Sequence, residues 1–256
     1  MSVGNERVQL QERVINLTYH FGRPLSQLPL ADFENLLYNE LSSLEKQDMT
    51  YEAGRGLETI PHLLDVGRLV EFYLTHSDFL KQDYFNNSEY SPYDWQRMIL
   101  IGAYLHDVGK NHLDARLLGR RGDLSREQLE EIKTHVNSSS QELETLGLEE
   151  PIQNIAFYHH ERVDGSGYPD GLKGDEIPRE VLPVSFFDAL HAIATRNYFR
   201  RTSKPKSAGE AVKYATNHLS KRFDQGVVEF VRSYAGSEDA PLYQILQGMM
   251  DNARNR

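Results

Sequence analysis

The sequence predicts an all-α protein built around one large helical domain. Apolar residues recur at spacings of three and four over 8–17, 33–44 and 63–74, which is the period of an amphipathic helix. Alternating strand patterns with hairpin dipeptides are absent from the sequence. A chain of 256 residues is long enough for one large domain and a smaller appendage.

Further helices follow from their start signals. Ser125 with Gln128 forms a capping-box pattern, and Ser207 with Glu210 forms another. The first of these helices is expected to run through 129–136. Pro151 suits the first turn of a helix that continues to residue 160. These segments add to a more fully apolar helix over 95–105, which we expect to lie in the core.

Two segments interrupt the helical pattern. The polar stretch 46–56 contains two glycines and marks a boundary, so we expect an N-terminal helical appendage over 1–55 and the main domain over 56–256. The segment 163–178 carries four glycines and two prolines. Such a loop lets the backbone approach a ligand closely, and a long loop in a compact helical domain is more often functional than accidental.

The composition excludes several classes of function. Lys and Arg total 28 against 38 Asp and Glu, giving a net charge of -10, so we expect no binding of nucleic-acid polymers through their phosphates. No apolar run approaches the roughly 20 residues that cross a bilayer, and no signal-peptide pattern is visible. The absence of cysteine rules out thiolate ligands and fits a reducing compartment. We therefore expect a cytoplasmic protein without membrane insertion.

The candidate chemistry centres on an adjacent histidine and aspartate at the end of a predicted core helix. His106 can offer a neutral nitrogen, and the two oxygens of Asp107 can bridge two cations. Such a pair alone is weak evidence, because it arises easily by chance. Asp188 adds to it, since it falls in an apolar stretch where an unpaired carboxylate is unfavourable. Glu58 and His62, four residues apart, share one helix face.

Further motifs follow these residues in a fixed order. They are His106-Asp107-Val108-Gly109-Lys110, then His135, then the run His-His-Glu-Arg-Val-Asp-Gly-Ser-Gly-Tyr-Pro over 159–169, and Phe223-Asp224. In this order the sequence resembles the HD-GYP family, a branch of the HD-domain metal-dependent phosphohydrolases. The resemblance covers roughly residues 58–232 and leaves the first fifty or so residues without a counterpart.

The resemblance implies a bundle of about five core helices around a buried metal site with two or three ions. By position, the family's metal ligands fall on His62, His106, Asp107, His135, His159, His160 and Asp188. Some relatives hold a third ion through a residue at the place of Glu58, although Pro61 lies between Glu58 and His62. Nitrogen and oxygen ligands suit Fe, Mn, Ni or Zn, and bridging carboxylates favour Fe or Mn.

The resemblance also implies an activity. Family members hydrolyse cyclic di-GMP to pGpG and often on to GMP, and some favour cyclic GMP-AMP. By the same analogy Asp107 would bridge the ions, and Lys110 would bind the scissile phosphate near the leaving oxygen. Tyr168 and Gly167 would shape the substrate pocket, and Arg200 would hold the second phosphate.

Three departures from the family pattern leave alternatives open. His191 replaces a second aspartate, Asn197 replaces an arginine, and 223–225 lacks the usual proline. The chain could act on another cyclic dinucleotide or a nucleotide, or serve as a non-catalytic sensing or interaction module, but the retained ligand set favours an enzyme. The basic segment 196–206 is an anion-attracting patch or a solvated helix end. The appendage 1–55 is expected to be a regulatory helix pair, a rigid connector, or a contact for a homodimer or signalling partner.

Overall fold

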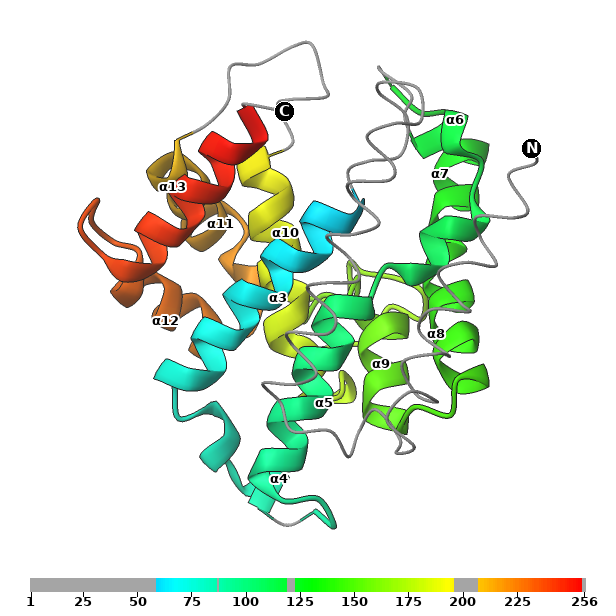
Figure 1. The fold of residues 1–256 in the computed structure, drawn as a ribbon, viewed down its shortest axis with the longest axis horizontal. Helices are drawn as coiled ribbons and strands as arrows, with labels where there is room; N and C mark the ends of the chain where they lie inside the picture. The colour runs from blue at the N-terminus through cyan, green and yellow to red at the C-terminus, as the bar shows by residue number, and fades with distance from the viewer. Residues whose placement is uncertain (1–58, 87, 119–122, 196–206, 255–256) are drawn as a thin grey trace.

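The computed structural model describes residues 59–86, 88–118, 123–195 and 207–254 (Figure 1). Helices and loops make up this part of the chain, and it contains no β-strand, only an isolated bridge between Asp164 and Lys173. The all-α prediction is confirmed. The predicted appendage 1–55 and the basic segment 196–206 lie outside the described residues, so the domain boundary stays a prediction.

The described helices follow one another in chain order. The α-helices are α3 (Thr59–His76), α4 (Asp83–Asn86), α5 (Pro92–Leu105), α6 (Ala115–Leu118), α7 (Arg126–Lys133), α8 (His135–Thr145), α9 (Glu150–Tyr158), α10 (Val181–Thr195), α11 (Ala208–His218), α12 (Gln225–Tyr234) and α13 (Pro241–Arg254). Short 3₁₀ helices lie between them: η2 (Phe79–Lys81), η3 (Val108–His112), η4 (Gly174–Glu176) and η6 (Ser220–Arg222).

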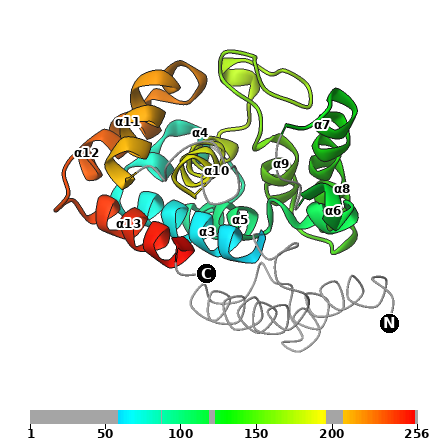
Figure 2. The same ribbon diagram turned by 90° about the horizontal axis from the view of Figure 1, so that it is seen from above.

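Helix α10 occupies the centre of the bundle. Figure 2 shows it nearly end-on, with α11, α12 and α13 on one side and α7, α8 and α9 on the other. It contacts α3, α5 and α9 as well as the three C-terminal helices. Its side chains are buried almost all the way round, which is the pattern of a helix enclosed by others. Asp188 and His191 on α10 are buried, so their polar side chains need partners in the protein interior.

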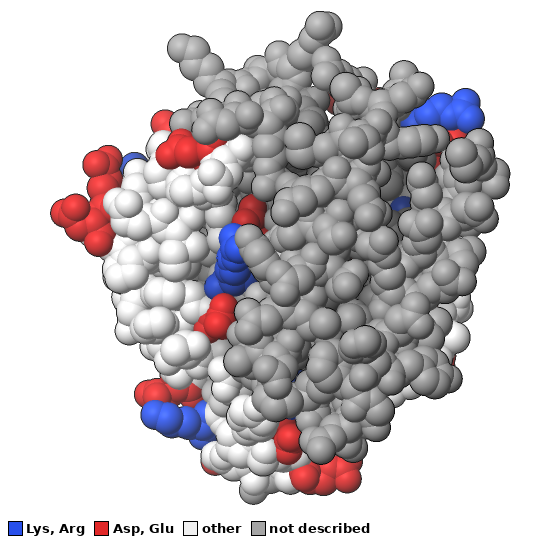
Figure 3. All heavy atoms as spheres, viewed as in Figure 1, with Lys and Arg blue, Asp and Glu red and all other residues white. Residues whose placement is uncertain are grey.

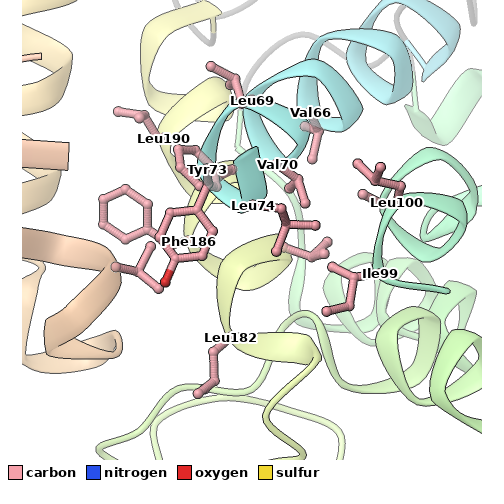
Figure 4. Close-up of a cluster of buried hydrophobic side chains, with 14 of the residues drawn as sticks. Val66, Leu69, Val70, Tyr73, Leu74, Ile99, Leu100, Leu182, Phe186 and Leu190 are labelled. Carbon is pink, nitrogen blue, oxygen red and sulfur yellow. The ribbon is translucent and has the colours of Figure 1, made fainter. Parts of the chain in front are cut away.

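The main apolar core joins α10 to α3 and α5. Figure 4 shows side chains from these three helices meeting, among them Leu69, Ile99 and Phe186, each fully buried. Full burial of a side chain of this size stabilises the fold by about 1.5–3 kcal/mol. The same helices carry candidate metal ligands at the start of α3, just after α5 and in the middle of α10, so the core fixes the spacing of those ligands.

The predicted helix starts are present. Ser125 Oγ accepts the backbone N–H of Gln128, and the Gln128 side chain accepts the backbone N–H of Ser125 at 3.0 Å. Ser207 Oγ accepts the backbone N–H of Glu210 at 3.2 Å. Pro151 lies in the first turn of α9, where its missing N–H leaves no helical bond unmade.

The helix predicted over 129–136 differs from the observed one. It divides at Thr134, which ends α7 and precedes α8. The Thr134 hydroxyl donates to the Glu131 carbonyl at 2.7 Å, and a threonine bonded in this way competes with helix continuation. His135 therefore begins α8 instead of lying inside one helix. Helix α9 also ends at Tyr158, so residues 159 and 160 follow the helix.

One face of the described bundle carries both signs of charge. On the described part of the face in Figure 3, Lys and Arg side chains are scattered among acidic and uncharged ones. None of the described helices is both long enough and apolar enough to cross a membrane.

The contact between α5 and α9 requires a glycine. A Cβ placed on Gly102 would lie 2.5 Å from Cδ1 and 2.9 Å from Cβ of Ile155. We expect Gly102→Ala to lower the free energy of unfolding by about 1–3 kcal/mol, because overpacking forces the helices apart. Urea unfolding followed by circular dichroism measures this change.

Gly248 on α13 provides the matched control, since a Cβ there meets no described atom within 4 Å. Gly248→Ala should leave stability unchanged or raise it by up to about 1 kcal/mol through helix propensity. A Gly102→Ala protein as stable as the Gly248→Ala protein would contradict this account of the α5–α9 contact.

Candidate metal centre

The candidate ligands reach one place from five parts of the bundle. His62 comes from the first turns of α3, and Asp188 from the middle of α10. The remaining ligands lie at helix ends: His106 and Asp107 just after α5, His135 at the start of α8, and His159 and His160 just after α9. Helix ends suit this purpose, because the chain turns there and a side chain can point along the gap between helices.

Asp107 is the common member of two groups of ligand atoms. One group combines it with His135, His159 and His160, and the other with His62 and His106; within each group the ligand atoms lie within 4.8 Å of one another. Asp107 Oδ1 lies 3.1 Å from His135 Nε2, and Oδ2 lies 3.4 Å from His106 Nε2. The two oxygens of one carboxylate therefore face two different sets of imidazoles.

Asp188 lies beside the same space on α10. Its Oδ1 lies 3.2 Å from His62 Nε2, and its Oδ2 lies 3.7 Å from His160 Nδ1. It thus contacts one histidine from each group around Asp107. Because α10 is enclosed by other helices, the buried carboxylate of Asp188 needs polar partners, and His62 and His160 supply them.

The orientation of His106, His135 and His159 is fixed in the same way. In each ring Nδ1 lies close to the backbone carbonyl three residues earlier, at 2.8 Å for His106, 2.6 Å for His135 and 3.0 Å for His159. A neutral ring that donates from Nδ1 to a carbonyl presents an unprotonated Nε2. All three Nε2 atoms point toward Asp107. Such backbone bonds are a common way of holding metal-ligating histidines.

The protonation states also suit a metal. Burial lowers the pKa of His159 to about 4 and the pKa of His160 well below its ordinary value. Burial alone would raise the pKa of Asp107, but Lys110 and His106 hold it well below its usual range. At neutral pH these imidazoles are neutral and this carboxylate is ionised, which are the forms that bind a cation.

The two carboxylates, Asp107 and Asp188, change the protonation of His62. Burial alone would lower its pKa, but its hydrogen bonds to Asp107 and Asp188 raise that pKa to about 9. The carboxylates therefore favour a positive charge at Nε2 of His62. A metal ion at that point would take the place of the proton.

One buried atom tests whether a cation belongs in this cluster. Asp107 Oδ1 is buried and has no hydrogen-bond partner among the described residues. Its neighbour His135 Nε2 carries no proton when Nδ1 donates to its carbonyl, so two acceptors face each other. An unsatisfied buried carboxylate oxygen is unfavourable, and a cation between the two atoms would remove the penalty. The nitrogen and oxygen donors therefore fit divalent metal ions.

The turn after Asp107 packs closely on α8. The backbone N–H of Gly109 donates to Ser139 Oγ at 2.8 Å, and a Cβ on Gly109 would lie 2.4 Å from the His135 carbonyl oxygen. Only glycine permits this approach. The turn also brings the ammonium group of Lys110 into contact with Asp107 Oδ2, with about a quarter of the lysine side chain exposed (24%).

The glycine-rich loop 163–178 is held from inside by Glu161. This carboxylate is buried and accepts the backbone N–H groups of Asp170, Gly171 and Leu172 at 2.7, 2.9 and 3.1 Å. Gly167 lies against the backbone of 160–162, where a Cβ would come within 2.5 Å of the Arg162 nitrogen. One acidic side chain therefore ties the loop to the end of α9.

Tyr168 forms a wall beside the ligands. Its ring centroid lies 4.7 Å from that of His160, and Lys133 Nζ lies 5.4 Å from the tyrosine ring. Burial raises the pKa of the tyrosine hydroxyl, so this group stays protonated at neutral pH. The ring is held between an imidazole and a cation, so its position relative to the ligands is fixed.

The structure brings together most of the residues that the sequence singled out. The residues that gather around the carboxylate of Asp107 are His62, His106, Lys110, His135, His159, His160, Tyr168 and Asp188. Glu58 and Arg200 lie outside the described residues, so their roles stay predictions. Gly167 packs against backbone, and its contact with substrate also stays a prediction.

Two contributing residues were missed by the sequence reasoning. Asp65 binds His191 and lies three residues after His62, a spacing that places both on one helix face. Glu161 belongs to the motif over 159–169 and comes shortly before the glycine-rich loop 163–178. An acidic residue in that place could have indicated an anchor for the backbone N–H groups of the loop. His191 was noted only as a departure, yet its Nδ1 lies 2.9 Å from His62 Nδ1.

Comparisons with known proteins agree with this fold. The HD domain family matches residues 82–227 of the chain. A cyclic di-GMP phosphodiesterase of Thermotoga maritima is 36% identical over 138 residues, which cover 51% of this chain and 35% of that relative. A 3'3'-cGAMP-specific phosphodiesterase 3 of Vibrio cholerae is 36% identical over 93 residues, covering 35% of this chain and 20% of the relative. The aligned segments thus span about a third or less of these relatives.

A solved structure shares the fold. Bd1817, an HDG"Y"P protein from Bdellovibrio bacteriovorus, superimposes with a TM-score of 0.54 at 17% identity, over 89% of this chain and 69% of that one. The chain belongs to the HD-domain family of helical proteins. Within that family it is a member of the HD-GYP branch, as its His-His-Glu and Gly-Tyr-Pro motifs indicate.

The Glu161 anchor makes a testable prediction about the loop. In Glu161→Gln the side chain keeps one acceptor but turns an amide donor toward backbone N–H groups. Hydrogen bonds to a charged acceptor contribute about 1.5–3 kcal/mol each. We therefore expect the amides of 170–172 to exchange hydrogen at least about tenfold faster, a change of about 1.4 kcal/mol. Hydrogen exchange read by mass spectrometry measures this directly.

Glu176→Gln is the control in the same loop, because the Glu176 carboxylate is exposed and accepts only the Lys173 N–H among the described bonds. It should leave the exchange of 170–172 within about twofold of the wild type, a difference of about 0.4 kcal/mol. Equal exchange in the two variants would disprove the anchoring role of Glu161.

Proposed function

We propose that this chain is a metal-dependent phosphodiesterase that hydrolyses cyclic di-GMP to pGpG, and in a second step to GMP. The observation that carries the proposal is the carboxylate of Asp107, whose two oxygens face separate sets of histidines. A site of this form suits two cations held by one bridging carboxylate, an arrangement that serves phosphoryl chemistry. The names of the curated relatives support a cyclic dinucleotide as the substrate.

Divalent ions bound there would neutralise phosphate oxygens and lower the pKa of the attacking water. The described ligands suit two ions, and we propose Fe or Mn, with Zn or Ni as the alternatives that the donor set allows. A third ion would require Glu58, which lies one helical turn before His62 in the sequence. The cysteine-free composition supports a cytoplasmic setting for this chemistry.

The chain's own residues have separate tasks in this proposal. Asp107 and Asp188 orient the imidazoles and keep the negative charge that retains cations. Lys110 keeps its ammonium group beside Asp107 Oδ2. From there it can donate a hydrogen bond to the scissile phosphate and a proton to the departing ribose oxygen.

Other residues bind the rest of the substrate. We propose that Tyr168 forms one wall for a base or phosphate, since its ring is held next to His160. Gly167 keeps the loop backbone near the ligands. Arg200 would bind the second phosphate, as its position in the family motif suggests. We leave the 1–55 appendage as the candidate contact for a second copy or a signalling partner.

Cyclic GMP-AMP is the second candidate substrate. A relative 36% identical over 93 residues is named for that specificity. The departure at Asn197 changes a residue expected to contact the dinucleotide. The change affects a residue expected to bind the substrate and leaves the described ligands intact, so it favours altered specificity over lost catalysis.

The decisive experiment measures metal content and turnover together. Protein loaded anaerobically with Fe(II) or with Mn(II) is incubated with cyclic di-GMP or 3'3'-cGAMP, and the products are separated by chromatography. We expect about two ions per chain and a linear dinucleotide product. His106→Ala and Asp107→Ala should lose bound metal and reduce turnover at least about 100-fold. Metal binding without cleavage of either substrate would favour a sensing module and overturn the enzyme proposal.

Lys110 gives a separate prediction. Lys110→Met keeps a side chain of similar length without the charge, and it should retain the metal while lowering kcat about 100-fold or more, as expected for loss of a general acid. Lys110→Arg, which keeps the charge, should bind substrate nearly as well but transfer a proton poorly, because the guanidinium does not deprotonate. Unchanged kcat in Lys110→Met would remove Lys110 from the reaction.

A further inference from the structure

His62 is held differently from the other histidines that offer Nε2 to the site. His106, His135 and His159 each place Nδ1 on a backbone carbonyl three residues earlier. His62 instead places Nδ1 at 2.9 Å from Nδ1 of His191, a side chain on α10. Its orientation therefore depends on a second side chain from a different helix.

His191 in turn is held by a carboxylate. Its Nε2 lies 3.2 Å from Oδ2 of Asp65, which stands on α3 one turn after His62. His191 is buried, and the Asp65 side chain is about one-fifth exposed (19%). The result is a chain of contacts from Asp65 through His191 to His62, which passes from α3 to α10 and back.

The hydrogen-bonding capacities of these groups fix a direction along the chain of contacts. An ionised carboxylate only accepts, so the proton of His191 lies on Nε2. A neutral His191 then has a lone pair on Nδ1 and accepts a hydrogen bond from the Nδ1–H of His62. When a metal ion takes the place of the proton on Nε2 of His62, the ring keeps its other proton on Nδ1. Nε2, which lies 3.2 Å from Asp188 and 3.5 Å from Asp107, then offers its lone pair to the ion.

We propose that Asp65 and His191 form a positioning pair that holds His62 in the tautomer and orientation required of a metal ligand. This inference rests on the metal centre of the proposed function. It assigns His191 a role outside the chemistry itself, since His191 acts through His62. The pair does for His62 what backbone carbonyls do for His106, His135 and His159.

The expected effect follows from the behaviour of other outer partners of metal-binding histidines. Loss of such a partner weakens metal binding by about 10- to 100-fold. His191→Leu removes the acceptor while filling a similar space. His191→Asn has nearly the same size as leucine but keeps a carbonyl oxygen near the place of Nδ1, so it can still accept from His62.

The test measures Mn²⁺ affinity and stoichiometry by calorimetry on the full chain, without substrate. We expect His191→Leu to weaken the site that includes His62 at least about tenfold, and His191→Asn to stay within about threefold of the wild type. Asp65→Ala should weaken binding in the wild type but have little further effect in the His191→Leu background. Urea unfolding of the chelated proteins checks that both His191 variants are equally folded.

Arg68→Ala is the matched control, because Arg68 is exposed and lies 3.9 Å from Oδ1 of Asp65 on the same helix. It should leave Mn²⁺ affinity unchanged. Equal weakening in His191→Leu and His191→Asn would show a packing role only, and unchanged affinity in His191→Leu would overturn the proposal.

The two proposals fail separately. A wild type that binds Mn²⁺ but cleaves no cyclic dinucleotide overturns the phosphodiesterase, while the effect of His191 on affinity still decides the positioning pair. If the wild type cleaves its substrate and His191→Leu binds Mn²⁺ as tightly as the wild type, the positioning pair alone is overturned. A wild type that binds no Mn²⁺ overturns both.

Discussion

The structure depends on one buried carboxylate, that of Asp107, which faces several unprotonated imidazole nitrogens and few hydrogen-bond donors. Asp107 is enclosed almost completely, and the Nε2 atoms of His106, His135 and His159 all point toward it. Backbone carbonyls hold the protons of those rings on the far nitrogen. Such a cluster is unfavourable in an apolar interior unless positive charge enters it. The charge available from the chain itself comes from Lys110 and from a protonated His62.

The bundle supplies the rigidity that this cluster needs. Helices α3, α5 and α10 carry ligands near the site and apolar side chains in the core shown in Figure 4. Close approaches at Gly102 and Gly109 bring α5 and the turn after it against α9 and α8. Because the ligands stand on elements already fixed by packing, their spacing costs little further conformational entropy when a cation binds.

Much of this site could be predicted from the sequence because its motifs carry both residue type and order. His106-Asp107, His159-His160 and Asp188 were all singled out from the sequence, and the structure gathers them. The pairing of His191 with Asp65 could not be read in the same way, since the two residues are 126 positions apart. The register of α3 against α10 brings them together, and that register is set by side-chain packing along both helices.

The break at Thr134 is a similar case. The apolar period over 129–136 continues through it, so periodicity predicts one helix. A local bond from the Thr134 hydroxyl to the Glu131 carbonyl accompanies the division of the segment. The break has a consequence for the site, because it places His135 at the first position of α8 with its ring bonded to the Ile132 carbonyl.

The anchor at Glu161 allows the outward side chains of the loop to change in evolution without a change at the histidine cluster. The loop 163–178 is tied to the ligand-bearing end of α9 through its backbone, while side chains such as Ser166, Pro169 and Asp175 face solvent. Backbone anchoring tolerates replacement of outward side chains, since the N–H groups are common to nearly all residues. Descendants of this sequence could therefore vary the outer surface of the loop, and with it the molecules that the loop meets, while the histidine cluster stays unaltered.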